Sequence, residues 1–115
     1  MTNSGFTEAQ ALGLAGSLLS KGASEEEAAT ATKNISSALT AGFAATGSQK
    51  EIFEMLGTDA ESVAIDMQDN AMGTLQSILQ GIKELDKEQQ SAAIKQLFGE
   101  EANPHVQKLL KDTER

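Results

Sequence analysis

The chain has 115 residues, of which 39% are hydrophobic, and this length suits one domain with a single core. Its net charge of −8 argues against nucleic-acid binding, because affinity for phosphates comes from Lys and Arg, and the nine such residues form no patch. The absence of cysteine excludes disulfides and thiolate chemistry, and no apolar run approaches the roughly 18 residues that a membrane span needs.

The amino-acid composition favours helices over strands. Because the chain has four Phe and no Trp or Tyr, its core must be built mainly from Ala, Leu, Ile and Met. No stretch shows the clean alternation of apolar and polar residues that is typical of strands. We therefore predict an all-α fold, a compact bundle of about five to seven short helices with helical hairpins. We expect residues 7–111 to form this single helical domain, between a flexible segment or engineered remnant at 1–6 and a charged tail at 112–115.

Two capping boxes open the first half of the chain. In the pairs Thr7 with Gln10 and Ser24 with Glu27, the first side chain can accept a backbone N–H and the second can reach back to the cap. Gly22 separates the two helices that follow these boxes. Their predicted apolar stripes are Ala9, Leu12, Ala15, Leu18 and Leu19 in the first, and Ala28, Ala31, Ile35, Ala38 and Leu39 in the second.

Two shorter helices are predicted next. Ser48 with Glu51 has the form of a third capping box, and Thr58 or Asp59 can cap a fourth helix. Asp69 and Asn70 offer a break after it, although the pattern from Val63 to Leu85 also fits one bent helix. The residues expected to face inward are Ile52, Phe53 and Leu56 in the third helix and Val63, Ala64 and Met67 in the fourth.

The clearest helix signals lie between Leu75 and Ala102. Asp86, with Gln89 three residues later, predicts a cap between two helices that fold back on each other as a hairpin. We expect the core to close around this corner. Gly99 is placed to end the second helix in a left-handed turn. The stripes are Leu75, Ile78, Leu79, Ile82 and Leu85, then Ala93, Ile94, Leu97 and Phe98, and finally Val106, Leu109 and Leu110 in a last helix with Pro104 in its first turn.

Carboxylates are the only abundant residues that could serve catalysis. They nearly all fall at predicted caps or first helical turns, where the helix dipole favours negative charge, so capping explains their placement. His105 is the only histidine and has no arrangement of Ser or Cys partners. We therefore predict no catalytic, cofactor-binding or metal-binding residues. The carboxylates considered are Glu25, Glu26, Glu27, Glu51, Glu61, Asp86, Glu100 and Glu101.

Three weaker patterns have structural interpretations. The run Asp66, Gln68, Asp69, Asn70 resembles the start of a calcium loop, but the sixth position is Ala71 instead of Gly and the twelfth is Ser77 instead of Glu. The triplet beginning at Asn34 fits a glycosylation pattern, yet it lies inside a predicted helix. Small residues four apart, such as Ala11 with Ala15 or Ala38 with Gly42, permit close helix packing within or between chains.

Two segments of the chain carry a resemblance to a known family. TEAQALGLAGSLLSKGASEEEAATATKNISSAL (7–39) has an opening helix, a Gly-x-Ser turn and an Ala-rich second helix. EIFEMLGTDAESVAIDMQDNAMGTLQSILQGIKELDKEQQSAAIKQLFGEEA (51–102) includes the stop at Leu97, Phe98 and Gly99. In this order they resemble the core region of phage tail tape measure proteins, over nearly the whole chain. Thr58, where an apolar residue is common, and Asp86, where Pro is common, depart from the family but keep a helix start.

This resemblance implies that the chain is a fragment of a much longer protein. Such a protein fills the lumen of the phage tail, sets tail length during assembly and leaves ahead of the DNA at ejection. It would lie in the virion tail, and in the host cytoplasm during assembly. Its expected partners are other tail proteins and copies of itself, without direct nucleic-acid binding or a membrane segment in this part. The family has no catalytic residues in this region, so none is expected here.

The expected compactness refines this role. One continuous helix of this length would span on the order of 170 Å, whereas a compact domain has a radius of gyration of about 13 Å. Because glycines interrupt the helices at Gly22, Gly42, Gly57 and Gly99, we expect a folded interaction node that adds little length. A free-standing helical adaptor or regulator without catalytic activity is an alternative, and a small hydrolase that uses the carboxylates is a third.

Overall fold

Helices make up most of the computed structural model, which describes residues 6–112 and has no strand among them. The elements are α1 (Glu8–Ser20), α2 (Glu25–Thr40), the 3-10 helix η1 (Gly42–Ala44), α3 (Gly47–Met55), α4 (Ala60–Asp69), α5 (Ala71–Lys83), α6 (Lys87–Phe98) and α7 (Asn103–Asp112). The predicted all-α class and number of helices are confirmed. We expected a flexible segment at 1–6 and a charged tail at 112–115. Residues 1–5 and 113–115 lie outside the described residues. Phe6 is described, and because it is buried in the core, the prediction is wrong at that residue.

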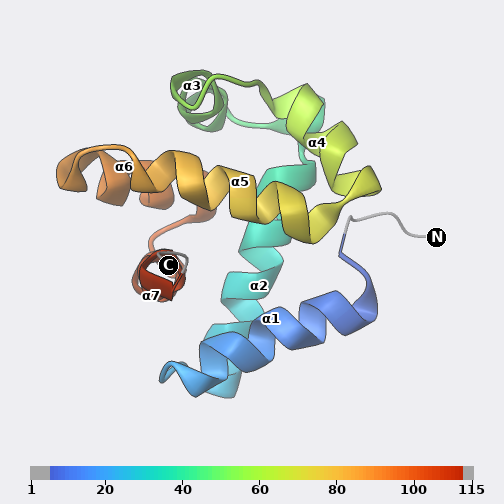
Figure 1. The fold of residues 1–115 in the computed structure, drawn as a ribbon, viewed down its shortest axis with the longest axis vertical. Coiled ribbons are helices and arrows are strands. Elements are labelled where there is room, and N and C mark those ends of the chain that lie inside the picture. Colours follow the sequence, from blue (N-terminus) through green and yellow to red (C-terminus); the bar gives the residue numbers. More distant parts are fainter. Residues whose placement is uncertain (1–5, 113–115) are drawn as a thin grey trace.

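The domain is arranged around α2. Helices α1, α4, α6 and α7 all pack against it, so it contacts elements from both ends of the chain (Figure 1). Its predicted stripe is confirmed, because Ala28, Ala31, Ile35, Ala38 and Leu39 are all buried. We expected the core to close around the corner at Asp86. This expectation is wrong, because the core is arranged around α2. Asp86 is exposed between α5 and α6, and the turn that joins these two helices lies at one side of the domain (Figure 1).

The stripe that we predicted for α1 is largely wrong. Leu14 and Leu18 are the buried residues of this helix. Leu12 and Leu19 are 69% and 42% exposed, and Ala9 is exposed as well. No charged residue occurs from Ala9 to Ser20, so apolar residues lie on every side of the helix and their spacing does not select one face. The structure buries one side and leaves another in solvent.

The other stripes follow the prediction closely. Three of their residues, Leu56, Ala64 and Leu85, are only half-buried. Apolar side chains that lie three and four positions apart therefore marked the buried side correctly wherever a helix also carries a polar side. The buried members are Ile52, Phe53, Val63, Met67, Leu75, Ile78, Leu79, Ile82, Ala93, Ile94, Leu97, Phe98, Val106, Leu109 and Leu110.

The predicted caps are correct in part. The boxes at Thr7 and Ser24 both form, and the Asp59 side chain accepts the Ser62 N–H at the start of α4. Asn70 accepts the Gly73 N–H, which separates α4 from α5 and decides against one bent helix. These polar side chains satisfy N–H groups that have no partner within the helix.

The cap of α3 lies two residues earlier than predicted. Thr46 accepts the Gln49 N–H at 3.0 Å, and the Gln49 side chain accepts the Thr46 N–H at 2.9 Å. The Gln49 amide also donates to the Leu97 carbonyl at the end of α6, at 2.9 Å. Ser48 and Glu51 fit the same sequence pattern, but this long-range hydrogen bond favours the earlier box.

The corner between α5 and α6 also differs from the prediction in its hydrogen bonds. Asp86 is the N-cap residue of α6, but its side chain makes no capping hydrogen bond. The predicted box with Gln89 therefore does not form. Instead, the Gln90 side-chain amide donates to the carbonyls of Lys83 and Leu85 at 2.9 and 3.0 Å, which satisfies the end of α5.

Four glycines lie where helices end, as predicted. Gly22, Gly42, Gly57 and Gly99 have positive φ angles of 106°, 56°, 85° and 97°, where a side chain would be strained. At Gly99 the ψ of 157° makes the backbone extended instead of forming the left-handed helical turn that we predicted. The resulting domain measures 38 × 31 × 25 Å, with a radius of gyration of 12.8 Å. None of its described helices is long and apolar enough to cross a membrane.

Candidate functional site

The carboxylates that could serve catalysis are spread around the domain. Glu25, Glu26 and Glu27 lie in the first turn of α2, and Glu61 lies in the first turn of α4. Glu51 is exposed within α3, Asp86 caps α6, and Glu100 and Glu101 are exposed in the turn before α7. The described residues contain no group of three or more acidic or histidine side chains that could hold a metal ion. The structure therefore does not bring these carboxylates together.

Glu27 and His105 form the closest contact among the predicted candidates. His105 Nε2 lies 3.8 Å from Glu27 Oε1, across the boundary between α2 and α7. The Ser24 N–H that donates to this carboxylate lowers the pKa of Glu27, and charge on His105 and Lys108 acts in the same direction. Glu27 also completes the capping box of α2 with Ser24, so the contact with His105 joins the start of α2 to α7.

The residues of the calcium-like run and of the glycosylation triplet lie within or between helices. Asp66 and Asp69 are helical residues of α4, while Asn70 caps α5, so the run does not form an open loop. Asn34 is half-buried in the middle of α2, near Gly99. Helical backbone directs successive side chains around the axis instead of toward one ion.

The two small-residue pairs pack inside the domain. Ala11 and Ala15 of α1 are partly buried against the core. Ala38 is buried, and a Cβ added at Gly42 would lie 3.6 Å from the Cβ of Ala64. Both pairs therefore bring helices of the same chain close together.

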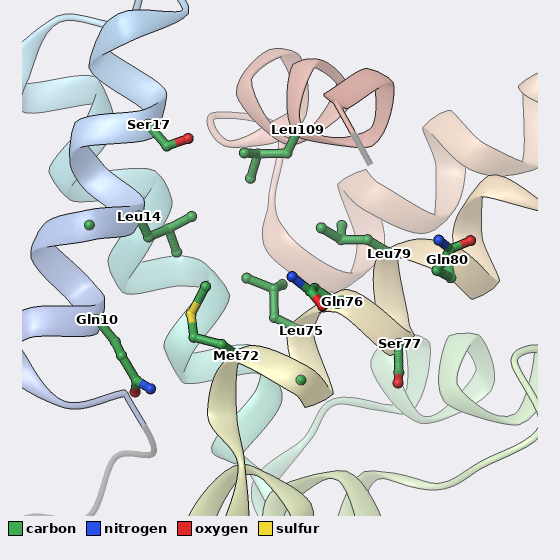
Figure 2. Close-up of a pocket in the computed structure, with 12 residues that line it drawn as sticks. Gln10, Leu14, Ser17, Met72, Leu75, Gln76, Ser77, Leu79, Gln80 and Leu109 are labelled. Atoms are coloured by element: carbon green, nitrogen blue, oxygen red, sulfur yellow. The ribbon is translucent and has the colours of Figure 1, made fainter. Parts of the chain in front are cut away.

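A groove of about 800 Å³ lies between α1, α5 and α7 (Figure 2). Leu14, Met72, Leu75, Leu79 and Leu109 supply its apolar side chains, one or more from each helix. Its polar residues are neutral, namely Gln10, Ser17, Gln76, Ser77 and Gln80. With no titratable group in its lining, the groove suits contact with a neutral or apolar surface instead of acid–base chemistry.

The outward side of α1 is the second unusual surface. A Cβ added at Gly13 or Gly16 would meet no atom within 4 Å, and neither residue has a positive φ. Glycine inside a helix costs about 1 kcal/mol relative to alanine, so the fold alone does not explain these residues. By contrast, a Cβ at Gly81 would lie only 3.2 Å from Leu56 Cδ2, which explains that glycine by packing within the domain.

We call this surface the α1 outer face. It is composed of exposed residues on one side of the helix: Ala9, Leu12, Gly13, Gly16, Leu19 and Ser20. Gly13, at its margin, also lines the groove between α1, α5 and α7. We missed its two glycines because, apart from the pair of Ala38 with Gly42, we considered glycine only as a helix stop. Two glycines three residues apart, inside a helix without charge, were the signal that could have revealed it.

Comparison with known proteins identifies the family. Residues 1–99 match the profile of the family described as "Phage-related minor tail protein". The chain belongs to this family. This phage tail protein is also 33% identical over 109 residues to the "Probable tape measure protein" of Halomonas phage phiHAP-1, which confirms the predicted resemblance. The similarity covers 95% of the present chain.

The family sets the coarse biological role of this phage tail protein. It is a structural protein of the virion tail, and other tail components are its partners. The chain spans only 13% of the length of the tape measure relative. No solved structure matches it. The neutral groove and the α1 outer face, not the dispersed carboxylates, are therefore surfaces on which a structural role can depend.

Proposed function

We propose that the chain is a compact segment of a tape measure protein and acts there as a folded interaction node. The full-length protein sets the length of the tail during assembly in the host cytoplasm and supports DNA ejection. The node contacts other tail proteins or copies of itself, while elongated helices elsewhere in the protein measure length. The similarity to a tape measure relative supports the first part of this proposal.

The size of the domain supports the second part of the proposal, that this segment is a folded node and does not measure length. Its longest dimension is 38 Å, whereas its 115 residues would extend over roughly 170 Å as one helix. A segment that folds in this way adds less than a quarter of the length that the same residues could measure. We also propose that residues 7–111 form one domain without a catalytic, cofactor or metal site, because the carboxylates are dispersed and most of them lie near helix starts.

In-frame deletion of residues 7–111 tests this role. Tails of the deletion phage, measured by electron microscopy, should shorten by at most about the 38 Å that the domain spans. The matched control removes an equal number of residues from a region with a heptad pattern, and should shorten tails by roughly 160 Å. A loss of about 1.5 Å per deleted residue in both phages would show that this segment measures length and is not a node.

Sequencing the flanking DNA separates the proposal from a free-standing adaptor. A reading frame that continues well beyond this segment, among other tail genes, supports a segment of a tape measure protein. A stop codon and an independent promoter around this segment would favour an adaptor.

A further inference from the structure

A second groove, of about 510 Å³, lies between α4 and α5, which pack against each other (Figure 1). Leu56, Val63 and Ile78 supply its apolar side chains, which we call the floor of the groove. On the α5 side, small residues at intervals of four positions keep it open, namely Gly73, Ser77 and Gly81. The groove therefore has room for a side chain of another molecule.

Asp66 and Asp69 make this groove acidic. Both line it and both are exposed, because residues three positions apart share one side of a helix. Within residues 6–112, neither carboxylate forms an ion pair or a hydrogen bond. They lie in the last turn of α4, which has no basic residue and where the helix dipole opposes negative charge. Since Asn70 supplies the capping hydrogen bond of α5, the two carboxylates are not needed to begin that helix.

The surrounding sequence supplies no cation for these carboxylates. Residues 51–82 contain six acidic residues and no basic one, so they carry −6 of the chain's net charge of −8. Lys50 and Lys83 lie at either end of this stretch and do not line the groove. Mutual repulsion of the carboxylates is relieved when a positively charged group from another molecule enters the groove.

We propose that this acidic groove binds a segment of another tail protein that presents lysine or arginine beside an apolar residue. The hydrocarbon part of the basic side chain lies on the floor of the groove, and its charged end reaches Asp66 and Asp69. Ile65, 66% exposed and four positions before Asp69, offers an apolar contact next to the carboxylates. A second copy of this chain is a poor occupant, because it carries −8 and its nine basic residues form no patch.

This inference rests on the proposed role as an interaction node and names the chemistry of one partner. Its first test uses a synthetic 14-residue helical peptide of alanine, leucine and lysine, and a matched peptide with glutamine in place of lysine. Each is titrated at low salt into the isotopically labelled chain and followed by nuclear magnetic resonance. With the lysine peptide, the largest shifts should occur at Val63, Gly73 and Ile78, and the glutamine peptide should bind at least about tenfold more weakly.

Reversing the charge of the groove tests its part in this binding. The double substitution Asp66→Lys with Asp69→Lys should weaken the lysine peptide at least about tenfold. Because lysine is favoured at the end of a helix, this variant should be no less stable than the original chain, and thermal unfolding checks that the loss does not come from misfolding. Glu100→Lys with Glu101→Lys is the matched control, which changes net charge equally at an exposed turn and should weaken binding less than about twofold.

Three results of the titration would overturn the proposal. They are equal weakening by the two double variants, largest shifts away from the groove, and equal binding of the lysine and glutamine peptides. If Asp66→Lys with Asp69→Lys proves less stable, Asp66→Asn with Asp69→Asn replaces it, with an expected loss of at least about threefold.

The same charge reversal in the full-length phage gene tests the partner itself. Phage with Asp66→Lys and Asp69→Lys should form at least about tenfold fewer complete tails than phage with the Glu100 and Glu101 control, and suppressors should replace a lysine or arginine of another tail protein by an acidic residue. Equal numbers of complete tails in the two phages would refute the proposal. Deletion of residues 7–111 measures tail length instead, so the groove and the node can fail independently.

Discussion

Replacing Gly16 by alanine should make the isolated domain more stable. The added methyl group meets no atom within 4 Å, and the backbone has no positive φ that alanine would strain. Alanine loses less conformational entropy than glycine on forming a helix, which gives a gain of about 0.5–1 kcal/mol. For a chain of this length, that gain corresponds to a rise in Tm of roughly 2–6 °C.

Thermal unfolding of dilute protein, followed by circular dichroism, measures this effect on the free domain. Gly99→Ala is the matched control, because φ is +97° at Gly99 and a Cβ there would lie 3.5 Å from Asn34 Nδ2. This control should lower stability by about 1 kcal/mol or more. A lower Tm for Gly16→Ala in dilute solution would refute the reasoning, since it would mean that the fold itself requires this glycine.

Two further predictions concern the core and the capping box. Phe53→Ala should lower the free energy of unfolding, measured by chemical denaturation, by about 3–5 kcal/mol because this side chain is fully buried. Phe43→Ala, at an 82% exposed position, should change it by less than about 0.5 kcal/mol. Similar effects of the two substitutions would contradict the described core. Glu27→Gln should lower Tm at neutral pH, because the pKa of Glu27 is lowered by folding and its ionised form therefore adds stability. That contribution is present above the ordinary pKa of 4.5 and is lost as the pH falls through the lower pKa of the folded state. The difference in Tm between the two proteins should therefore disappear at acidic pH. A Tm difference that is constant with pH would contradict this account.

The predictability of each helix from sequence depended on whether it has a polar side. In α2, charged and hydroxyl residues separate the apolar positions, and all five predicted stripe residues are buried. Helix α1 has no such contrast, so spacing alone could not choose between the side with Leu14 and Leu18 and the side with Leu12 and Leu19. The choice was made by packing against α2, which is a tertiary contact that a local pattern does not contain.

The error at the cap of α3 has the same origin. Thr46 with Gln49 and Ser48 with Glu51 both satisfy the capping-box pattern, and they overlap in sequence. The hydrogen bond from Gln49 to the Leu97 carbonyl, 48 positions away, distinguishes them only once α3 and α6 are packed together. The helix stops at the four glycines, in contrast, were predicted correctly, because the conformational freedom of glycine is a property of the residue itself, although Gly99 does not form the left-handed helical turn that we predicted.

The surfaces available for function were the least predictable part. Acidic residues drew attention as candidate catalytic groups, but their distribution follows from helix starts, which sequence reasoning had already recognised. The groove between α1, α5 and α7 depends on helices that lie far apart in the chain, so no local signal marks it. The glycines of the α1 outer face, in contrast, left a trace in the sequence.

Two groups of glycines in this chain differ in what the fold requires of them. Those with positive φ allow the turns that reduce a possible length of roughly 170 Å to a domain 38 Å long. Gly13 and Gly16 contribute nothing to that folding, and alanine at either position would make the domain more stable. A segment that only had to fold would gain from such a replacement, so these two glycines are not accounted for by the stability of the domain.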